Sequence, residues 1–332
     1  MTHRAGGAAR EAPLRLVLIL SENHTLFPSR DLRALVRAAV EAETAGFDAV
    51  MVSEHVALGP GADAQGRPEN PRDYALPGNQ DPSMPWPDPL VLLSAAAAAT
   101  SRLRLVASSI IAPLRHPVLL AQQLATLDLL SEGRLVVQPT VSWHRAEYEA
   151  LGVAFESRGE LLDEHLEAWR VLWRDTPASF QGRHYAFRDV SLEPKPFQPE
   201  GPPLWFGGQT LHDRLLQRLV THGSGFNPLG PPTDDERSRL REAMTAAGRD
   251  PAELEMVGGT RGRFPDATSV ADLDEALAQI PTQLARGFTT ICIKPSQFLD
   301  EPERFGSWCR DVFGRMAELV RSPRSSGGAP TR

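Results

Sequence analysis

The chain contains 332 residues, of which 41% are hydrophobic and 23% are charged, and its formal net charge at pH 7 is −7. This composition provides a sizeable apolar core for one large α/β domain or for two ordinary domains. The acidic balance and the absence of a basic run argue against a nucleic acid or an anionic membrane as partner, because proteins that bind these concentrate Lys and Arg.

The cysteines and the two ends of the chain bear on its compartment. Cys292 and Cys309 form no CxxC motif, so we expect buried thiols, and so few cysteines fit the reducing cytoplasm. The N-terminal run MTHRAGGAAREAP lacks the apolar segment of a signal peptide, and LVLLSAAAAA is too short to span a membrane. We therefore expect a cytoplasmic protein with a flexible segment at residues 1–13 and a disordered tail at 321–332.

The first quarter of the chain predicts two strands, a helix and a long loop. The run LRLVLIL at 14–20 is almost continuously apolar, as in a strand that is covered on both faces. A helix begins near Ser29, carries apolar residues at helical spacing, and ends at Gly46. The run FDAVMV at 47–52 is the second strand. Residues 53–87 are rich in Pro, Gly, Asp and Asn, and a loop of this length is usually functional or disordered.

Strands and helices alternate through the rest of the chain. We predict further strands at 103–110, 135–141, 204–206, 224–228, 254–258 and 289–294. We predict further helices at 88–100, 117–130, 158–173, 211–223, 233–247, 270–286 and 301–320. A small hairpin, with the sequence FQGRHYAF, interrupts the alternation between residues 176 and 202.

Eight strands, each followed by a helix, predict right-handed crossovers and a parallel sheet. Such a series in about 300 residues fits a (β/α)8 TIM barrel, which spans roughly 200 to over 400 residues. A doubly wound open sheet is the alternative, and the absence of a GxGxxG motif after the first strand weakens it. Because the alternation never gives way to another composition, we predict a single barrel domain at residues 14–320, with insertions.

In a TIM barrel the active site lies at the carboxyl ends of the strands. Glu54 and His55 directly follow the second strand. A histidine there can exchange protons near neutral pH, and a neighbouring carboxylate can orient a ligand. The alternative is a loop histidine that hydrogen-bonds to the backbone. His24 and His116 also lie near strand ends, but His116 precedes Pro117 at a helix start, where a structural role is plausible.

The turn Gly207-Gly208-Gln209-Thr210 follows the fifth strand and has features of an anion site. Its glycines allow the backbone to approach a ligand closely, Thr210 and Asp213 have the spacing of a capping box, and the next helix offers free N–H groups to a phosphate. A plain strand-to-helix turn is the alternative. Four cations near strand ends predict a barrel mouth that attracts anions, unless they are solvated loop charges. They are Arg115, Arg261, Arg263 and Lys294.

Two other chemistries have little support. His144 and Glu147 could place two metal ligands on one helical face, but no HExxH motif or second nearby histidine completes a site. A surface pair is the better interpretation, and we predict no metal. There is no GxSxG motif either, so nothing supports an acyl-transfer triad.

Four runs of the sequence are specific in combination: PLRHPVLLAQQLATLDLLSEGRL, SWHRAEYEALGVAFESRGELLDEHLEAWRVLW, AETAGFDAVMVSEH and PLWFGGQT. Together they resemble the luciferase-like monooxygenase superfamily, and most of all its branch that uses the deazaflavin coenzyme F420. The resemblance extends from about Leu14 to Val320. It implies a (β/α)8 barrel with a flavin or deazaflavin ring across its mouth, in agreement with the strand count. It also suggests a homodimer.

The resemblance implies roles for individual residues. In the deazaflavin sugar-phosphate dehydrogenases of the superfamily, an Asp-His pair after the second strand contacts the coenzyme and transfers a proton, and Glu54-His55 occupies that place. The family's non-proline cis peptide, which forms a bulge under the ring after the third strand, corresponds to Ser109-Ile110. The family's phosphate contacts correspond to the turn from Gly207 to Thr210.

The fourth strand departs from the family pattern. Relatives carry a glycine-rich run there, whereas this chain has Gln138-Pro-Thr140-Val-Ser142-Trp143. Pro and Val exclude glycine-only backbone conformations, so the side chains of Gln138, Thr140 and Ser142 would supply hydrogen bonds to the coenzyme instead. Trp143 stands where the sugar-phosphate dehydrogenases have a catalytic Glu, which argues against a sugar-phosphate substrate.

We therefore expect an oxidoreductase that transfers a hydride between coenzyme F420 and a small organic substrate. His55 would exchange the accompanying proton, and Trp143 and a lid from Tyr74 to Trp86 would complete the pocket. An FMN-dependent monooxygenase that activates oxygen is the alternative, because the FMN phosphate would fit the same turn. A barrel that only holds a small ligand, without catalysis, is the third interpretation.

Overall fold

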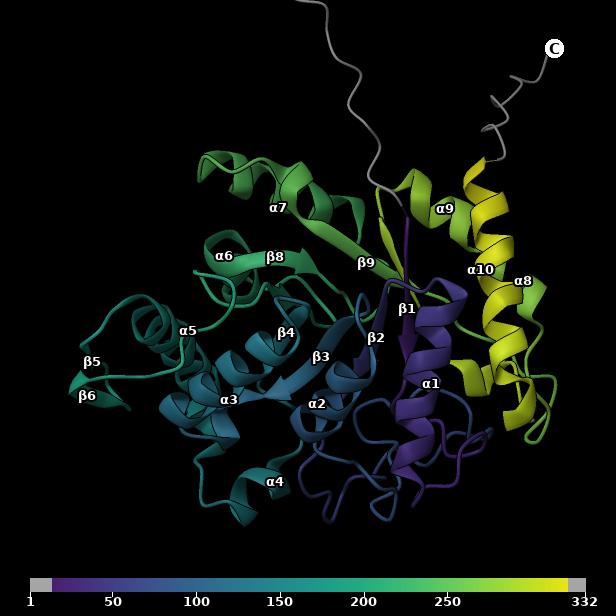
Figure 1. Ribbon diagram of the computed structural model, residues 1–332, viewed down its shortest axis with the longest axis horizontal. Coiled ribbons are helices and arrows are strands. Elements are labelled where there is room, and N and C mark those ends of the chain that lie inside the picture. The colour runs from purple at the N-terminus through teal and green to yellow at the C-terminus, as the bar shows by residue number, and fades with distance from the viewer. Residues whose placement is uncertain (1–13, 322–332) are drawn as a thin grey trace, which may run out of the picture.

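Eight parallel strands close into a barrel in the order β1-β10-β9-β8-β7-β4-β3-β2 (Figure 1). The computed structural model describes residues 14–321. The barrel strands are β1 (Arg15–Ile19), β2 (Ala49–Val52), β3 (Arg104–Ile111), β4 (Leu135–Thr140), β7 (Leu204–Phe206), β8 (Gly223–Phe226), β9 (Glu255–Gly259) and β10 (Thr290–Ile293). This architecture confirms the predicted (β/α)8 barrel. The segment 1–13 and residues 322–332 of the expected tail lie outside the described residues.

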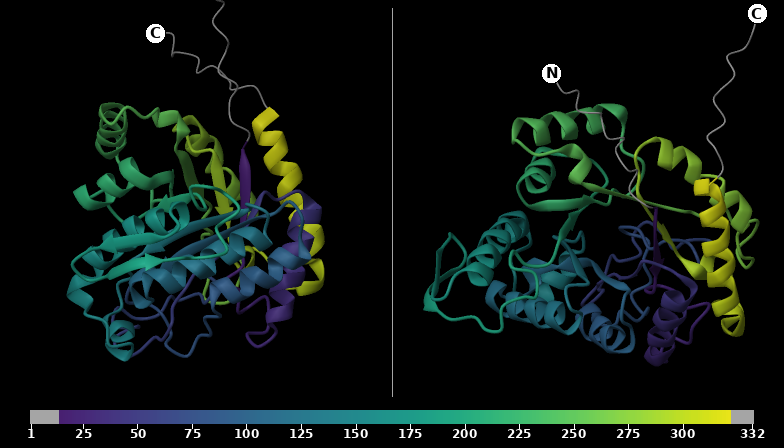
Figure 2. Two further views of the ribbon diagram at one scale, coloured as in Figure 1. Left: turned by 60° about the vertical axis from the view of Figure 1, so that its left-hand side comes forward. Right: turned by 45° about the horizontal axis from the view of Figure 1, so that its top comes forward.

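Helices cover the outside of the strands, and α10 packs along α1, so that the first and last helices are neighbours (Figure 2). The helices are α1 (Leu32–Ala45), α2 (Pro89–Ala99), α3 (Pro117–Leu130), α4 (Arg145–Ala150), α5 (Arg158–Arg174), α6 (Asp213–His222), α7 (Asp234–Ala246), α8 (Leu273–Leu277), α9 (Ile280–Ala285) and α10 (Phe305–Arg321). Short 3-10 turns are η1 (Ala112–Leu114), η2 (Phe155–Ser157), η3 (Pro251–Glu253), η4 (Pro295–Gln297) and η5 (Pro302–Arg304). Within residues 14–321, no helix is long and apolar enough to cross a membrane.

Two helices differ from their predicted extents, and one helix was not predicted. The segment 270–286 forms two short helices, α8 and α9, because Pro281 lacks the N–H that a continuous helix needs there. Helix α10 begins at Phe305, after the turn η5, and ends at Arg321, which therefore does not belong to the expected tail. The six-residue helix α4 was not predicted.

Alternate side chains along each strand point into two different apolar layers, one inside the barrel and one between the strands and the helices. Val17 and Ile19 of β1 lie in the inner cluster, with side chains from β2, β3, β4, β7, β9 and β10. Leu16 and Leu18 belong to the outer cluster, which contains the buried helix residues. This period of two, with both faces covered, is the geometry of barrel strands. The two cysteines are free and buried, as predicted.

Charged side chains close the N-terminal end of the barrel. Arg104, the first residue of β3, donates hydrogen bonds of 3.0 and 2.9 Å to the two carboxylate oxygens of Glu255, the first residue of β9. Arg15 of β1 lies 3.2 Å from this carboxylate, and Thr290 of β10 donates to it. Burial raises the pKa of Glu255, but these donors and cations outweigh burial and hold the pKa below its ordinary value. Contacts at this end of a barrel serve stability.

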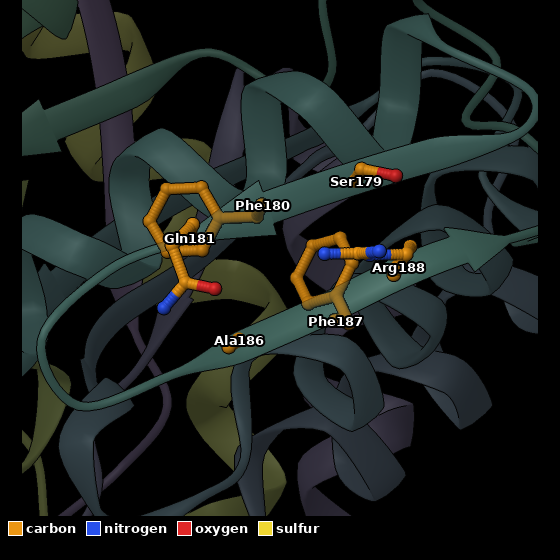
Figure 3. A pocket seen from close by; sticks show the side chains of 6 residues that line it. All are labelled: Ser179, Phe180, Gln181, Ala186, Phe187 and Arg188. Carbon is orange, nitrogen blue, oxygen red and sulfur yellow. The ribbon is translucent and has the colours of Figure 1, made fainter.

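β5 (Ala178–Gln181) and β6 (Ala186–Val190) form the predicted hairpin, which lies outside the barrel beside α5 (Figure 1). Phe180 and Phe187 stack there with 5.8 Å between their ring centroids. A cavity of about 440 Å³ opens along the hairpin (Figure 3) and is lined by Ser179, Phe180, Gln181, Ala186, Phe187 and Arg188. Because the hairpin alone supplies its walls, this cavity does not belong to the barrel mouth.

Candidate active site

His55 follows β2 at the barrel mouth and is only 8% exposed. Its ring packs edge-on against Trp86, with 4.8 Å between the ring centroids, and the centroid of Trp143 lies 6.0 Å away. Its Nδ1 atom lies 3.1 Å from the Oε1 atom of Glu147, a residue 92 positions further along the chain. The predicted catalytic histidine therefore lies in an aromatic pocket, beside a carboxylate that was not predicted to belong to the site.

Glu147 of α4 is completely buried and fully hydrogen-bonded. Besides facing His55, its Oε1 atom accepts the main-chain N–H groups of Val56 and Ala57, at 2.8 and 3.3 Å. Its Oε2 atom accepts the hydroxyl of Ser142 at 3.2 Å. Burial raises the pKa of Glu147, but the hydrogen bonds and the charge of protonated His55 outweigh burial and lower the pKa. Glu147 therefore presents an ionised carboxylate to the histidine.

The interpretation of His144 and Glu147 as a surface pair is wrong. His144 is 3% exposed, and its Nε2 atom accepts the N–H of Gly59 at 2.8 Å. Desolvation lowers the pKa of His144 in spite of the nearby Glu147 charge, which keeps this ring neutral and able to accept. Both residues hold the beginning of the 53–87 loop, because the chain after β4 crosses beside the end of β2.

Glu54 is buried and uses both carboxylate oxygens within the protein. Arg115 donates to Oε2 at 2.9 Å and to Oε1 at 2.5 Å, and the main-chain N–H of Ile111 donates to Oε2 at 2.7 Å. Burial lowers the pKa of Arg115, but its bonds with Glu54 outweigh burial and raise it. Glu54 thus anchors the segment after β3, and its direct contact with a coenzyme remains a prediction.

The cis peptide and its bulge lie within β3, and the cis bond is one residue earlier than predicted. The cis peptide joins Ser108 to Ser109, so the expectation of a cis bond at Ser109-Ile110 is wrong. Ser108 pairs with Gln138 and Ile110 with Pro139, which leaves Ser109 as the extra residue of the bulge. Ile110 is fully buried in the outer core cluster, whereas Ser109 is partly exposed. Ser109 is therefore the residue of this pair whose side chain can meet a ligand.

The side chains of the fourth-strand run make defined contacts. Gln138 is 5% exposed, and its Oε1 atom accepts both Ser108 Oγ and Asn227 Nδ2 at 2.9 Å. Thr140 ends β4 and is partly exposed, and Ser142 has a left-handed backbone with φ 57°. Trp143, also partly exposed, packs against His144 as well as facing His55. The Ser142 hydroxyl donates to Glu147. Thr140 is therefore better placed than Ser142 to hydrogen-bond to a coenzyme.

The turn after β7 needs glycine for packing. A Cβ atom at Gly207 would lie 1.8 Å from the carbonyl oxygen of Asn227, so no side chain fits. The predicted capping box is wrong, because α6 begins at Asp213 and His212 caps it by accepting the N–H of Leu215 at 3.2 Å. The adjoining Gly208 is partly exposed, and Gln209 and Thr210 are exposed. Phosphate binding by Gly207 to Thr210 remains a prediction.

The two other histidines have different surroundings. His116 caps α3, where its Nδ1 atom accepts the N–H of Val118 at 3.3 Å, and this confirms its structural role. His24 is partly exposed, and burial lowers its pKa, although Glu22 acts in the opposite direction. Neither ring forms part of the pocket of His55, Trp86 and Trp143.

The prediction of a mouth with free positive charge is wrong. Each of the four cations has a carboxylate partner, and Lys294 is only 1% exposed. The closest nitrogen–oxygen distances are 2.5 Å for Arg115 and Glu54, 2.8 Å for Arg261 and Asp73, 3.1 Å for Arg263 and Glu275, and 3.6 Å for Lys294 and Glu22. These four positive charges near strand ends are therefore balanced by carboxylates, most of which lie far away in the sequence.

The sequence model of the luciferase-like monooxygenase family matches residues 15–292. The chain belongs to this family. It is 35% identical over 216 residues to an uncharacterized protein of Mycobacterium tuberculosis, covering 64% of this chain and 74% of that protein. It is 26% identical over 246 residues to an FMNH2-dependent dimethylsulfone monooxygenase of Pseudomonas putida, covering 69% of this chain and 66% of the relative.

Solved structures share the luciferase-like fold. A monooxygenase from Streptomyces bottropensis superposes with a TM-score of 0.68 at 20% identity, over 92% of this chain and 100% of that one. An F420-dependent secondary alcohol dehydrogenase, solved with an F420–acetone adduct, superposes with a TM-score of 0.65 at 16% identity, over 93% of this chain and 99% of that one. Identities this low establish the fold alone.

In this luciferase-like barrel the 53–87 loop is tied across the mouth. Tyr74 donates to the carbonyl of Thr260 at 3.0 Å and packs against the inner apolar cluster, and burial raises the pKa of its hydroxyl. Asn70 donates to two carbonyls of the segment after β9. Arg72 makes hydrogen bonds of 2.8 to 2.9 Å to the carboxylate of Asp300. The loop, which starts after β2, is thus fastened to the segments that follow β9 and β10, on the far side of β1.

Proposed function

We propose that this luciferase-like protein is an oxidoreductase that transfers a hydride between coenzyme F420 and a small organic substrate. The observation that carries the proposal is His55, a titratable ring at the end of β2 and enclosed by Trp86 and Trp143. A hydride leaves or reaches a substrate carbon together with a proton on the adjoining heteroatom, and His55 is placed to exchange that proton. The coenzyme supplies the redox chemistry when bound.

The residues at the mouth fit a flavin-type coenzyme. The indole Nε1 of Trp86 is buried and has no hydrogen-bond partner among the described residues, which favours a ligand acceptor beside His55. Ser109, Thr140 and Trp143 would contact the ring, together with the more deeply placed Glu54, Gln138 and Ser142. Ile110 would contribute through its backbone only.

Main-chain N–H groups would bind the phosphate of the coenzyme. Arg115, Arg261, Arg263 and Lys294 are paired, so the turn from Gly207 to Thr210 is the better candidate for the anionic tail. Its two glycines leave the N–H groups uncovered by side chains.

An FMN-dependent monooxygenase is the second candidate. The relative from Pseudomonas putida, whose name states an FMNH2-dependent reaction, supports it at 26% identity. The fold does not separate the two candidates, because an F420-dependent alcohol dehydrogenase and a monooxygenase superpose on 93% and 92% of this chain. The two coenzymes would occupy the same mouth, so their affinities distinguish the candidates.

Quenching of tryptophan fluorescence by oxidised F420 and by FMN, titrated side by side, tests the proposal. Trp86 and Trp143 report on the site, and we expect F420 to bind more tightly than FMN. Tighter binding of FMN, with oxygen consumption when a flavin reductase and NADPH are added, would favour the monooxygenase. Coenzyme binding that persists in His55→Asn while turnover is lost would distinguish an enzyme from a barrel that only holds a ligand.

We also propose that the chain forms a homodimer through α2 and α3, which pack against each other. These helices expose Val91, Leu119 and Leu130 to 72%, 51% and 57%. Neighbouring helices that are apolar on their outer faces favour a partner that covers them, and a second copy offers the same apolar face.

A further inference from the structure

We infer that Glu147 is a positioning residue for His55, which holds the imidazole with its proton on Nδ1 and leaves Nε2 to exchange a proton with the substrate. This inference rests on the proposed function, in which His55 takes or gives the proton that accompanies hydride transfer. It assigns a role to a buried residue of α4: Arg145 and Glu149, each two positions from Glu147, are exposed, whereas Glu147 has no exposed surface.

The hydrogen bonds fix which nitrogen of His55 carries the proton. Oε1 of Glu147 accepts the N–H groups of Val56 and Ala57, so this oxygen is an acceptor. The Nδ1 atom of His55, 3.1 Å from the same oxygen, must then donate. In a neutral imidazole only one nitrogen carries a proton, so Nε2 is the acceptor.

The carboxylate is itself held from several directions. The left-handed backbone at Ser142, with φ 57°, turns the chain after β4, and the Ser142 hydroxyl donates to Oε2 of Glu147. On the loop side, His144 accepts the N–H of Gly59. The donors Val56, Ala57 and Ser142 therefore fix the carboxylate of Glu147, and a fixed carboxylate restricts the ring of His55 to one orientation.

This arrangement has a chemical consequence. If the bound coenzyme accepts a hydride from the carbon that bears a substrate hydroxyl, the O–H proton would pass to Nε2 of His55, and a carbonyl product and an imidazolium would result. The negative charge of Glu147 stabilises that imidazolium, and the reverse reaction returns the proton from Nε2 to the carbonyl oxygen. Removal of the partner that orients a metal-bound histidine typically costs about 10- to 100-fold, and we expect a loss of this order for His55.

The first test reads the tautomer directly and needs neither coenzyme nor substrate. Protein labelled with 15N at histidine is studied by long-range 1H–15N NMR at pH 7.5, and the signals of His55 are assigned by their loss in His55→Asn. We expect the Nδ1–H tautomer in the parent protein and a mixture of tautomers in Glu147→Gln. An Nε2–H tautomer in the parent, or unchanged signals in Glu147→Gln, would overturn the inference.

The second test uses turnover of F420 with 2-propanol as the probe substrate. We expect Glu147→Gln to lower kcat by about 10- to 100-fold with little change in KM, and to have no further effect in the His55→Asn background. Glu149→Gln, on the exposed face of the same helix, is the matched control and should leave kcat unchanged. A kcat for Glu147→Gln equal to that of Glu149→Gln contradicts the inference. Failure of F420 to bind contradicts the proposed function instead, and the NMR result still decides the role of Glu147.

Discussion

The guanidinium group of Arg115 donates to both carboxylate oxygens of Glu54, at 2.9 and 2.5 Å. It also reaches Asp88, the residue that caps α2, at 3.2 Å. Glu54 immediately precedes His55, and Arg115 lies just beyond the bulge of β3. This one cation therefore ties together the ends of two adjacent barrel strands beside the candidate catalytic histidine.

The first prediction concerns stability at this pair. The Glu54 side chain is 2% exposed, so Arg115→Met leaves a buried carboxylate without its cation. We expect the free energy of unfolding, measured by urea denaturation, to fall by about 3 kcal/mol. Arg263→Met is the control, because Arg263 is 81% exposed and its pair with Glu275 should contribute less than about 1 kcal/mol. Equal losses in the two variants would contradict this account.

A second prediction concerns the fastening of the 53–87 loop. Arg72→Met removes the bonds to Asp300 across the mouth, and we expect thermolysin to cleave the loop several-fold faster. Arg67→Met provides a matched control on the same loop, because the partners of Arg67, Asp63 and Asp81, belong to the loop itself. If both variants are cleaved at the same rate, Arg72 does not hold the loop closed.

The buried His144 makes one contribution to the pH dependence of stability, beside those of His24, His165 and His222, whose pKa values are also lowered. The pKa of His144 is lower in the folded protein than the value near 6.5 of an unfolded chain. The unfolded state therefore binds more protons between the two pKa values, and stability is fully present above pH 6.5 and declines as the pH falls through the folded pKa. We expect the free energy of unfolding to drop between pH 7.5 and 5.5, and the contribution of this one group to that drop has a ceiling of about 1.4 kcal/mol. His144→Gln, whose amide oxygen can reach the position of Nε2 and accept from Gly59 but does not titrate, should weaken that dependence, and an unchanged slope would refute the assignment.

The fourth prediction addresses the dimer. Leu119→Asp places a charge on the apolar face of α2 and α3, and we expect the mass in solution, measured by light scattering, to fall from that of two chains to one chain of 36.3 kDa. Leu229→Asp is the control, since Leu229 is similarly exposed at 59% but lies in the segment between β8 and α7. A parent protein that is already monomeric would exclude this interface.

The barrel could be predicted from the sequence because its signals are local. Helix α3 spans 117–130 as predicted, since Pro117 favours the first turn of a helix and Gly133 follows its end with φ 80°. The limits of β7 at 204–206 were also correct, because the apolar run is short and glycines follow it. The helix predicted at 270–286 is divided at Pro281, because the missing N–H of proline outweighs the apolar residues at helical spacing around it.

The candidate site could be predicted only in part, because its contacts join distant residues. His55 was recognised from its place after a strand, but its partner Glu147 is 92 positions away and lies among charged residues typical of a surface. The partners of the cations are equally remote, as with Arg261 and Asp73, which are 188 positions apart. A signal for Glu147 was present, since it lies beside the apolar Tyr148, which is also fully buried, but only the closed barrel shows where that segment packs.

The carboxylate of Glu255 joins residues from β1, β3, β9 and β10 at the end of the barrel opposite to His55. Because these contacts lie far from the mouth, the mouth can be varied in laboratory evolution without disturbing them. A library that varies loop residues 53–87 other than Asn70, Arg72 and Tyr74 would leave the contacts of Glu255 unchanged, so most members should still fold. New substrate preferences could then be selected without first restoring the stability of the scaffold.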